Sequence, residues 1–271
     1  MSTLLIKPLS PLNLLLLSAL LLSACSEQQA KVKQAPLPAV EQHATIPDFA
    51  IHPIVADKKK AFFDFLRPLV IYENTLVLND RYFVEYSQQK LSNKPALSNK
   101  ERSRLDKIAK RYKVKKDFNS ADYWRQLLLR VDVIPSSLAL SQAALESGWG
   151  SSRFAKEGNN IFGQWCFKAG CGLVPANRVE GKHHEVAAFA TVNLSVQKYL
   201  LNLNRLGSYK TLRAIRAELR QNKQAITGIA LAQGLGKYSE LGDEYIKHIT
   251  GMITANGLEA DDLHPIFLPQ P

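Results

Sequence analysis

The 271-residue sequence predicts an α+β fold that is predominantly α-helical. Apolar residues recur at the three- and four-residue spacing of amphipathic helices from Lys58 to Gly148, and again from Leu194 to Asn256. Between residues 170 and 190 this period fails, and glycines separate short apolar stretches, which favours turns and a small β-hairpin. We therefore expect a helical body that carries a small β-lobe.

Residues 1–24 have the features of a lipoprotein signal peptide. Lys7 precedes a leucine-rich run, Leu12 to Leu22, which is short for a transmembrane span. The string Leu22-Ser23-Ala24-Cys25 resembles a bacterial lipobox, which implies cleavage before Cys25 and a lipid on that cysteine. Ser26 resembles the sorting signal for a Gram-negative outer membrane, so the expected location is its periplasmic face. An uncleaved anchor or an ordinary signal peptide is the alternative.

Residues 25–57 are polar, contain four prolines and show no sustained period, so we expect a flexible tether. Residues 58–132 predict an N-terminal helical flank, with a kink or break at Pro68. Ser98 and Glu101 form a capping-box pattern that opens a basic helix, and another helix is expected near Tyr123 to Val131. Residues 133–257 form the main domain, and residues 258–271 a C-terminal tail.

One glutamate ends an apolar helix within the main domain. Ser136 or Ser137 can cap the start of this helix and Gly148 ends it, so Glu146 lies in the last turn. The negative end of the helix dipole and nearby aromatic residues are expected to raise the pKa of Glu146. A carboxylic acid that keeps its proton near neutral pH can protonate a glycosidic oxygen. A surface glutamate near a helix end is the alternative interpretation.

The residues after this helix carry a family resemblance. SQAALESGWG, from Ser141 to Gly150, and the later Asn160-Ile161-Phe162-Gly163 are similar to the glucosaminidase domain of peptidoglycan hydrolases, glycoside hydrolase family 73. Together with HEVAAF and NLNRLGSY, these strings resemble the bacterial Bax proteins, a branch that carries this domain, from about Lys58 to Ala255. The resemblance implies a lysozyme-like fold, a catalytic domain over 133–257 and Glu146 as general acid.

Two further catalytic candidates follow from the resemblance. The family is expected to carry a second carboxylate on the β-lobe, for which Glu180 is the first choice and Glu185 the second. Gly236-Lys237-Tyr238-Ser239 resembles the G-Y-x-[TS] loop, in which a tyrosine lines the cleft, but one residue more separates Tyr238 from Tyr245 than in the family pattern. Tyr238 as a simple packing residue remains the alternative.

Substrate-binding candidates surround Glu146. Trp149, Phe162 and Trp165 can offer flat faces to sugar rings or can pack in the core. Gln142 lies one turn before Glu146 on the same helical face, so it can hydrogen-bond the acid or the N-acetyl group of a sugar.

Three cysteines give an odd count. With the lipid on Cys25, Cys166 and Cys171 remain as a pair, and an oxidising periplasm favours a local disulfide. A metal site that joins these two with His183 and His184 is the alternative, but no further spaced ligands support it, so neither a metal nor a cofactor is expected.

The sequence therefore predicts an endo-β-N-acetylglucosaminidase that cleaves peptidoglycan glycan strands. A lytic transglycosylase on the same fold and a non-catalytic peptidoglycan-binding lipoprotein are the alternatives. The net charge of +11 favours polyanions such as peptidoglycan and anionic lipids, and nucleic acid belongs to another compartment. We expect a monomer. Arg213, Arg216 and Arg220 share one helical face, which is a solvated surface or a wall-binding patch.

Overall fold

Helices dominate the structure, a computed structural model that describes residues 32–93, 96–115, 117–176, 178, 181 and 183–269. The helices are α1 (Val55–Ser92), α2 (Asn99–Arg111), α3 (Ala121–Arg130), α4 (Ser136–Ser147), α5 (Arg153–Gly158), α6 (Val192–Arg205), α7 (Lys210–Gln221), α8 (Gly228–Ala232) and α9 (Asp243–Ala255). The strands are β1 (Trp165–Cys166), β2 (Gly172–Leu173) and β3 (Glu185–Ala187), and the 3-10 turns are η2 (Phe49–Ile51), η3 (Gly207–Tyr209) and η4 (Leu258–Leu263). The predicted α+β fold, predominantly α, is confirmed. The signal peptide over 1–24 and Cys25 lie outside the described residues.

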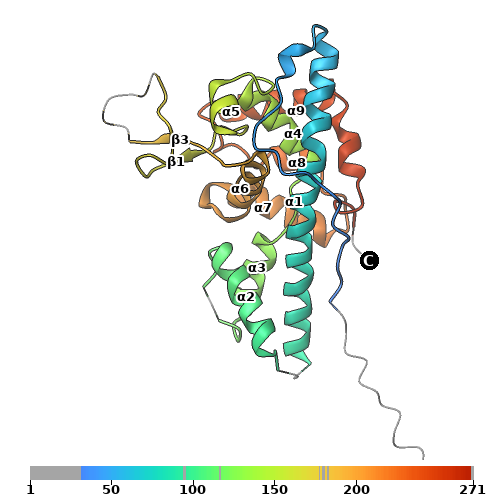
Figure 1. Cartoon of the computed structure of the whole chain (residues 1–271). Helices are drawn as coiled ribbons and strands as arrows, with labels where there is room; N and C mark the ends of the chain where they lie inside the picture. Colours follow the sequence, from blue (N-terminus) through green and yellow to red (C-terminus); the bar gives the residue numbers. More distant parts are fainter. Residues whose placement is uncertain are drawn as a thin grey trace, which may run out of the picture. The chain divides into compact units, whose positions relative to one another are not determined.

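The long helix α1 forms one side of the body (Figure 1). It contacts α2 and α3 near its C-terminal end and α4 and α6 elsewhere. The predicted break at Pro68 is wrong, because α1 runs through that residue. Leu66 and Leu69 beside it are buried, and their packing offsets the lost backbone hydrogen bond. The predicted capping box of Ser98 and Glu101 opens α2.

The segment predicted as a tether is bound to the body in its described part. Ala35 exchanges two backbone hydrogen bonds with the side chain of Asn79 in α1, and the backbone of His43 bonds Asn193 and Val192 in α6. Ile46 and Phe49 are buried in the core. The prolines and polar residues hid these two apolar anchors, so the expectation of a flexible segment up to residue 57 needs this correction.

Residues 258–269 belong to the core instead of forming a tail. The carboxylate of Asp262 in η4 accepts hydrogen bonds from the Ser137 hydroxyl and backbone at the start of α4, and from the backbone of Gly228. Phe267 is buried, and its carbonyl accepts from Ile226. Ser136 and Ser137 do not cap α4, since Pro135 occupies the N-cap position and Asp262 supplies the acceptor.

The predicted β-element is an antiparallel sheet of three strands in the order β1-β3-β2. Trp165 and Leu173 both pair with Val186 of the central strand β3. A Cβ at Gly172 would lie 2.0 Å from the carbonyl oxygen of Val186, so only glycine allows β2 to approach β3 this closely. Among the described residues no helix is both long enough and apolar enough to cross a membrane.

Candidate functional site

Glu146 lies in the last turn of α4, as predicted. Gly148 follows with φ of 56°, in the left-handed region that ends helices, and the apolar residues of α4 are buried. The carboxyl group of Glu146 is half-buried. Burial raises its pKa above the ordinary value, and a hydrogen bond from Tyr245 opposes this rise. The end of α4 therefore fixes the position of Glu146 in the chain, and burial favours the protonated form of its carboxyl group.

A chain of hydrogen bonds leads from the core to this carboxyl group. The Tyr199 hydroxyl donates to Gln142 Oε1 at 2.6 Å, Gln142 Nε2 donates to the Tyr245 hydroxyl at 2.9 Å, and that hydroxyl donates to Glu146 Oε1 at 2.8 Å. Tyr199, Gln142 and Tyr245 are all buried. Each donor points toward Glu146, so Oε1 is held as an acceptor.

The turn that follows α5 brings a glycine to the other carboxyl oxygen. A Cβ built at Gly163, whose φ is 61°, would lie 3.3 Å from Glu146 Oε2. The Asn160 side chain holds this turn, because its Oδ1 accepts from the backbone of Phe162 and Gln164 and its Nδ2 donates to the carbonyls of Gln164 and Ala187. The Asn-Ile-Phe-Gly string thus places the smallest residue next to the acid.

Tyr238 lies beside this site but does not bond Glu146. Its ring stacks on that of Tyr245, with centroids 5.2 Å apart, and its hydroxyl donates to the carbonyl of Phe162 at 3.0 Å. The tyrosine that contacts the acid is Tyr245 of α9, which the sequence analysis named only as the tyrosine downstream of this loop and not as a site residue. Burial, and then the charge of Glu146, raise the pKa of Tyr209, which adds a third tyrosine near the acid.

Two of the three predicted sugar platforms pack against other aromatic rings of the protein. Trp149 packs edge-on against Phe62 and Phe63 of α1, and Lys59 lies over its ring. Phe162 is 2% exposed and stacks on Tyr199 with centroids 3.8 Å apart. Phe162 therefore offers no free face to a sugar, and Trp149 is only partly exposed. Helical and turn spacing does not reveal which side of a residue the core covers. Gln142 is likewise buried and reaches the acid only through Tyr245.

Trp165 is the candidate platform that stays accessible. It lies on β1, is 59% exposed, and stacks on His184 with centroids 4.1 Å apart and an angle of 18° between the rings. Phe167, in the adjoining loop, is 78% exposed. The β-lobe therefore presents two exposed aromatic rings.

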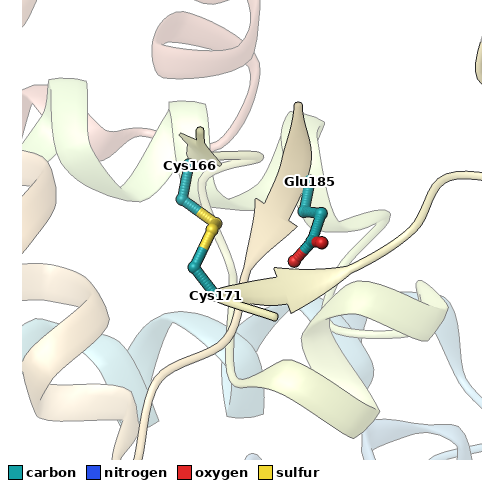
Figure 2. A group of neighbouring side chains, drawn as sticks. All are labelled: Cys166, Cys171 and Glu185. Atoms are coloured by element: carbon teal, nitrogen blue, oxygen red, sulfur yellow. A yellow bond between two sulfur atoms is a disulfide. The ribbon is translucent and has the colours of Figure 1, made fainter. Parts of the chain in front are cut away.

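Cys166 and Cys171 form the predicted disulfide, with Cα atoms 6.2 Å apart (Figure 2). The buried carboxylate of Glu185 lies next to it and accepts backbone hydrogen bonds from Gly170 and Gly172. These bonds lower the pKa of Glu185, the bond from Gly170 contributing most. Both sulfurs are bonded to each other, so this cluster offers no thiolate to a metal.

The second catalytic carboxylate stays a prediction. Glu180, the first choice, lies outside the described residues. Glu185, the second choice, accepts a backbone hydrogen bond on each of its oxygens within the disulfide loop. Of the predicted catalytic and sugar-binding residues, the structure brings Gln142, Tyr238 and Phe162 close to Glu146. It places Trp149 against α1 and Trp165 on the β-lobe.

Comparison with known proteins identifies the family of the chain. Residues 121–258 match the glucosaminidase family model, described as mannosyl-glycoprotein endo-beta-N-acetylglucosaminidase. The chain is 36% identical over 214 residues to Protein bax of Escherichia coli strain K12. These aligned residues make up 79% of this chain and 75% of that protein. No solved structure matches. With a matching model over half of its length and a relative similar over most of it, the chain belongs to the glucosaminidase family.

Proposed function

We propose that this protein is a peptidoglycan hydrolase, an endo-β-N-acetylglucosaminidase in which Glu146 is the general acid. The family supports a glycosidase acting on a glycan. The observation that carries the proposal is the half-buried carboxyl group, whose pKa burial raises, with one oxygen bonded by Tyr245 and the other beside Gly163.

The hydrogen-bond directions assign the two oxygens of Glu146. Oε1 accepts from Tyr245, so in the protonated acid the proton belongs on Oε2. Gly163 leaves space next to Oε2, because it has no side chain there. In our proposal Oε2 protonates the glycosidic oxygen as its bond to the anomeric carbon breaks, and water then adds to that carbon. Tyr245 acts as a positioning residue that holds the carboxyl group during this transfer.

In this proposal either Glu180 takes up the proton of the attacking water on the opposite face of the sugar, or the acetamido group of the substrate stabilises the anomeric carbon there. We place a glycan ring on the exposed face of Trp165, since flat aromatic faces bind sugar rings and the His184 ring covers the other side. The basic charge of the chain favours the carboxylates of the wall.

Digestion of purified peptidoglycan sacculi tests this proposal. Wild-type protein should release fragments with reducing N-acetylglucosamine ends, identified by mass spectrometry, and Glu146→Gln should retain binding but release none. If wild-type protein binds sacculi and releases nothing under any condition, it is a binding protein and the enzymatic proposal is wrong.

A lytic transglycosylase is a second candidate. Glu185 is engaged in the lobe, and a transglycosylase can work with one glutamate because a hydroxyl of the sugar itself attacks. Anhydromuramic ends among the products would identify this reaction in the same spectra.

The location is also a proposal. We infer that a lipid on Cys25 anchors the protein at the periplasmic face of a Gram-negative membrane, and Ser26 after the cysteine favours the outer membrane. Labelled palmitate should enter the wild-type protein and not the Cys25→Ala variant. Equal labelling of both would exclude this anchor.

A further inference from the structure

A pocket of about 230 Å³ lies between α1, α3 and α7, away from Glu146 in the sequence. Five arginines and one aspartate line this basic pocket: Arg81, Arg125, Arg213, Arg216, Arg220 and Asp132. The predicted solvated stripe on α7 is therefore wrong for two of its three members, since Arg213 and Arg216 are 5% and 1% exposed.

The basic pocket carries more positive than negative charge. Asp132 pairs with Arg81 and Arg220, and its Oδ2 lies 3.8 Å from Arg216 Nε. Outside the pocket lining, Glu85 pairs with Arg81 and Asp122 pairs with Arg125. Five cations thus meet three carboxylates, which leaves a surplus of two positive charges.

The surplus is concentrated at the buried arginines. Arg213 donates only through Nη1, to the carbonyls of Leu203 and Leu206, so within the described chain its Nε and Nη2 have no partner. Arg216 donates to backbone carbonyls such as those of Leu129 and Val133 and to the side chain of Asn204. Neutral carbonyls do not cancel a charge, and burial, the largest cause, lowers the pKa of both arginines to about 10.

We propose that the basic pocket binds a small phosphate dianion, either a free phosphate ester or a lipid phosphate headgroup. A phosphate monoester carries about two negative charges at neutral pH, which matches the surplus. Guanidinium groups bind phosphate through paired N–H donors, and Arg213 and Arg125 retain such donors. The volume is sufficient for a phosphate group and part of its ester.

Calorimetric titration of the full chain with inorganic phosphate tests the proposal. We expect one saturable site with a Kd below about 1 mM, and weaker binding of acetate, which carries a single charge. Arg125→Glu should weaken phosphate binding at least about tenfold, because it removes a donor and reverses a charge at the pocket. The side chain of Arg125 is 62% exposed and, within the described part of the chain, bonds only Asp122, so this variant should fold, which circular dichroism checks.

Lys60→Glu is the matched control. Lys60 is also an exposed helical cation paired with a nearby aspartate, Asp64, and it lies 21 residues from Arg81 along α1, about 30 Å at the rise of an α-helix. Its substitution should leave phosphate binding within about twofold of wild type. The proposal is wrong if no saturable binding occurs, if acetate binds as well as phosphate, or if the two variants behave alike.

Two further ligands distinguish the sources of the phosphate. Titration with a short-chain phosphatidic acid probes a lipid headgroup, and titration with a sugar phosphate probes a soluble ester. Tighter binding of one identifies the source, and equal binding supports the shared phosphate chemistry. Binding of neither, while wild-type protein binds inorganic phosphate, would indicate an adventitious ion and overturn the proposal.

Discussion

Replacing Tyr245 by phenylalanine tests the assignment of the general acid most directly. The substitution keeps the ring that stacks on Tyr238 and removes the hydroxyl that donates to Glu146 Oε1. That bond stabilises the charged carboxylate and holds the pKa of Glu146 below the value that burial alone would give. Its loss must therefore raise this pKa further.

The magnitude follows from the bond energy. A hydrogen bond to a charged group contributes about 1.5–3 kcal/mol, and the lower end applies because the carboxyl group is half-buried and partly screened by water. Since about 1.36 kcal/mol corresponds to one pH unit, the titration should move upward by roughly one pH unit. The substitution also leaves the buried Nε2 of Gln142 without its acceptor, which should lower the free energy of unfolding by about 1–3 kcal/mol.

The assay is the rate of release of labelled fragments from sacculi as a function of pH. A general acid works only while protonated, so activity falls as pH rises through its pKa, and Tyr245→Phe should move this basic limb to higher pH. Tyr123→Phe is the control, because Tyr123 is also buried but its hydroxyl has no hydrogen-bond partner among the residues that the structure describes. A basic limb that stays in place in Tyr245→Phe, or that moves equally in both variants, would refute the reasoning.

Three further predictions concern stability and the β-lobe. Glu146→Gln should raise Tm near neutral pH by about 2–4 °C, roughly 1 kcal/mol. Because the pKa of Glu146 is raised in the folded protein, ionisation of this half-buried group lowers the stability of the fold as pH rises above about 4.5. Thermal melts at pH 4 and pH 7 should show the gain only at pH 7, and a gain at both would contradict the prediction. Gly163→Ala and Gly257→Ala should each lower the free energy of unfolding by about 1–2 kcal/mol, since both glycines have φ of 61°. Only Gly163→Ala should also reduce digestion, because its Cβ meets Glu146 Oε2, whereas a Cβ at Gly257 meets nothing within 4 Å. Equal digestion by the two variants would contradict this. Replacing Cys166 and Cys171 by serine should lower the free energy of unfolding by about 2 kcal/mol, the entropy term of a short closed loop. Hydrogen exchange should become faster in the β-lobe while α4 stays protected. Equal loss of protection in both regions would contradict a local role of the disulfide.

The sequence predicts the helices and the position of the acid well because these depend on local rules. Apolar spacing and Gly148 define α4, and they place Glu146 in its last turn whatever the rest of the chain does. The partner of the acid depends on a contact between residues 99 positions apart, and helical spacing alone makes Tyr245 look like any core residue. For the same reason, spacing could not show that Trp149 faces α1.

The predicted tether fails for a different reason. Composition registers the prolines and polar residues of 25–57, whereas two buried side chains, Ile46 and Phe49, are enough to fasten the segment. Charged residues also lead the sequence-based prediction of burial astray. The arginine stripe on α7 has a polar pattern, but Arg213 and Arg216 are buried because backbone carbonyls near the ends of α3 and α6 accept their hydrogen bonds.

If the lipid that we propose on Cys25 is present, the docking of Ala35 onto Asn79 limits how far the folded body can lie from the membrane. With the lipid that we propose on Cys25, only about ten residues separate the anchor from this fixed point, and even fully stretched they span at most about 35 Å. The segment between the proposed lipid and Ala35 is therefore short. With that anchor, the site would reach glycan strands close to the lipid surface, and it would reach more distant layers of the wall only if the contacts of Ala35 with Asn79 were broken.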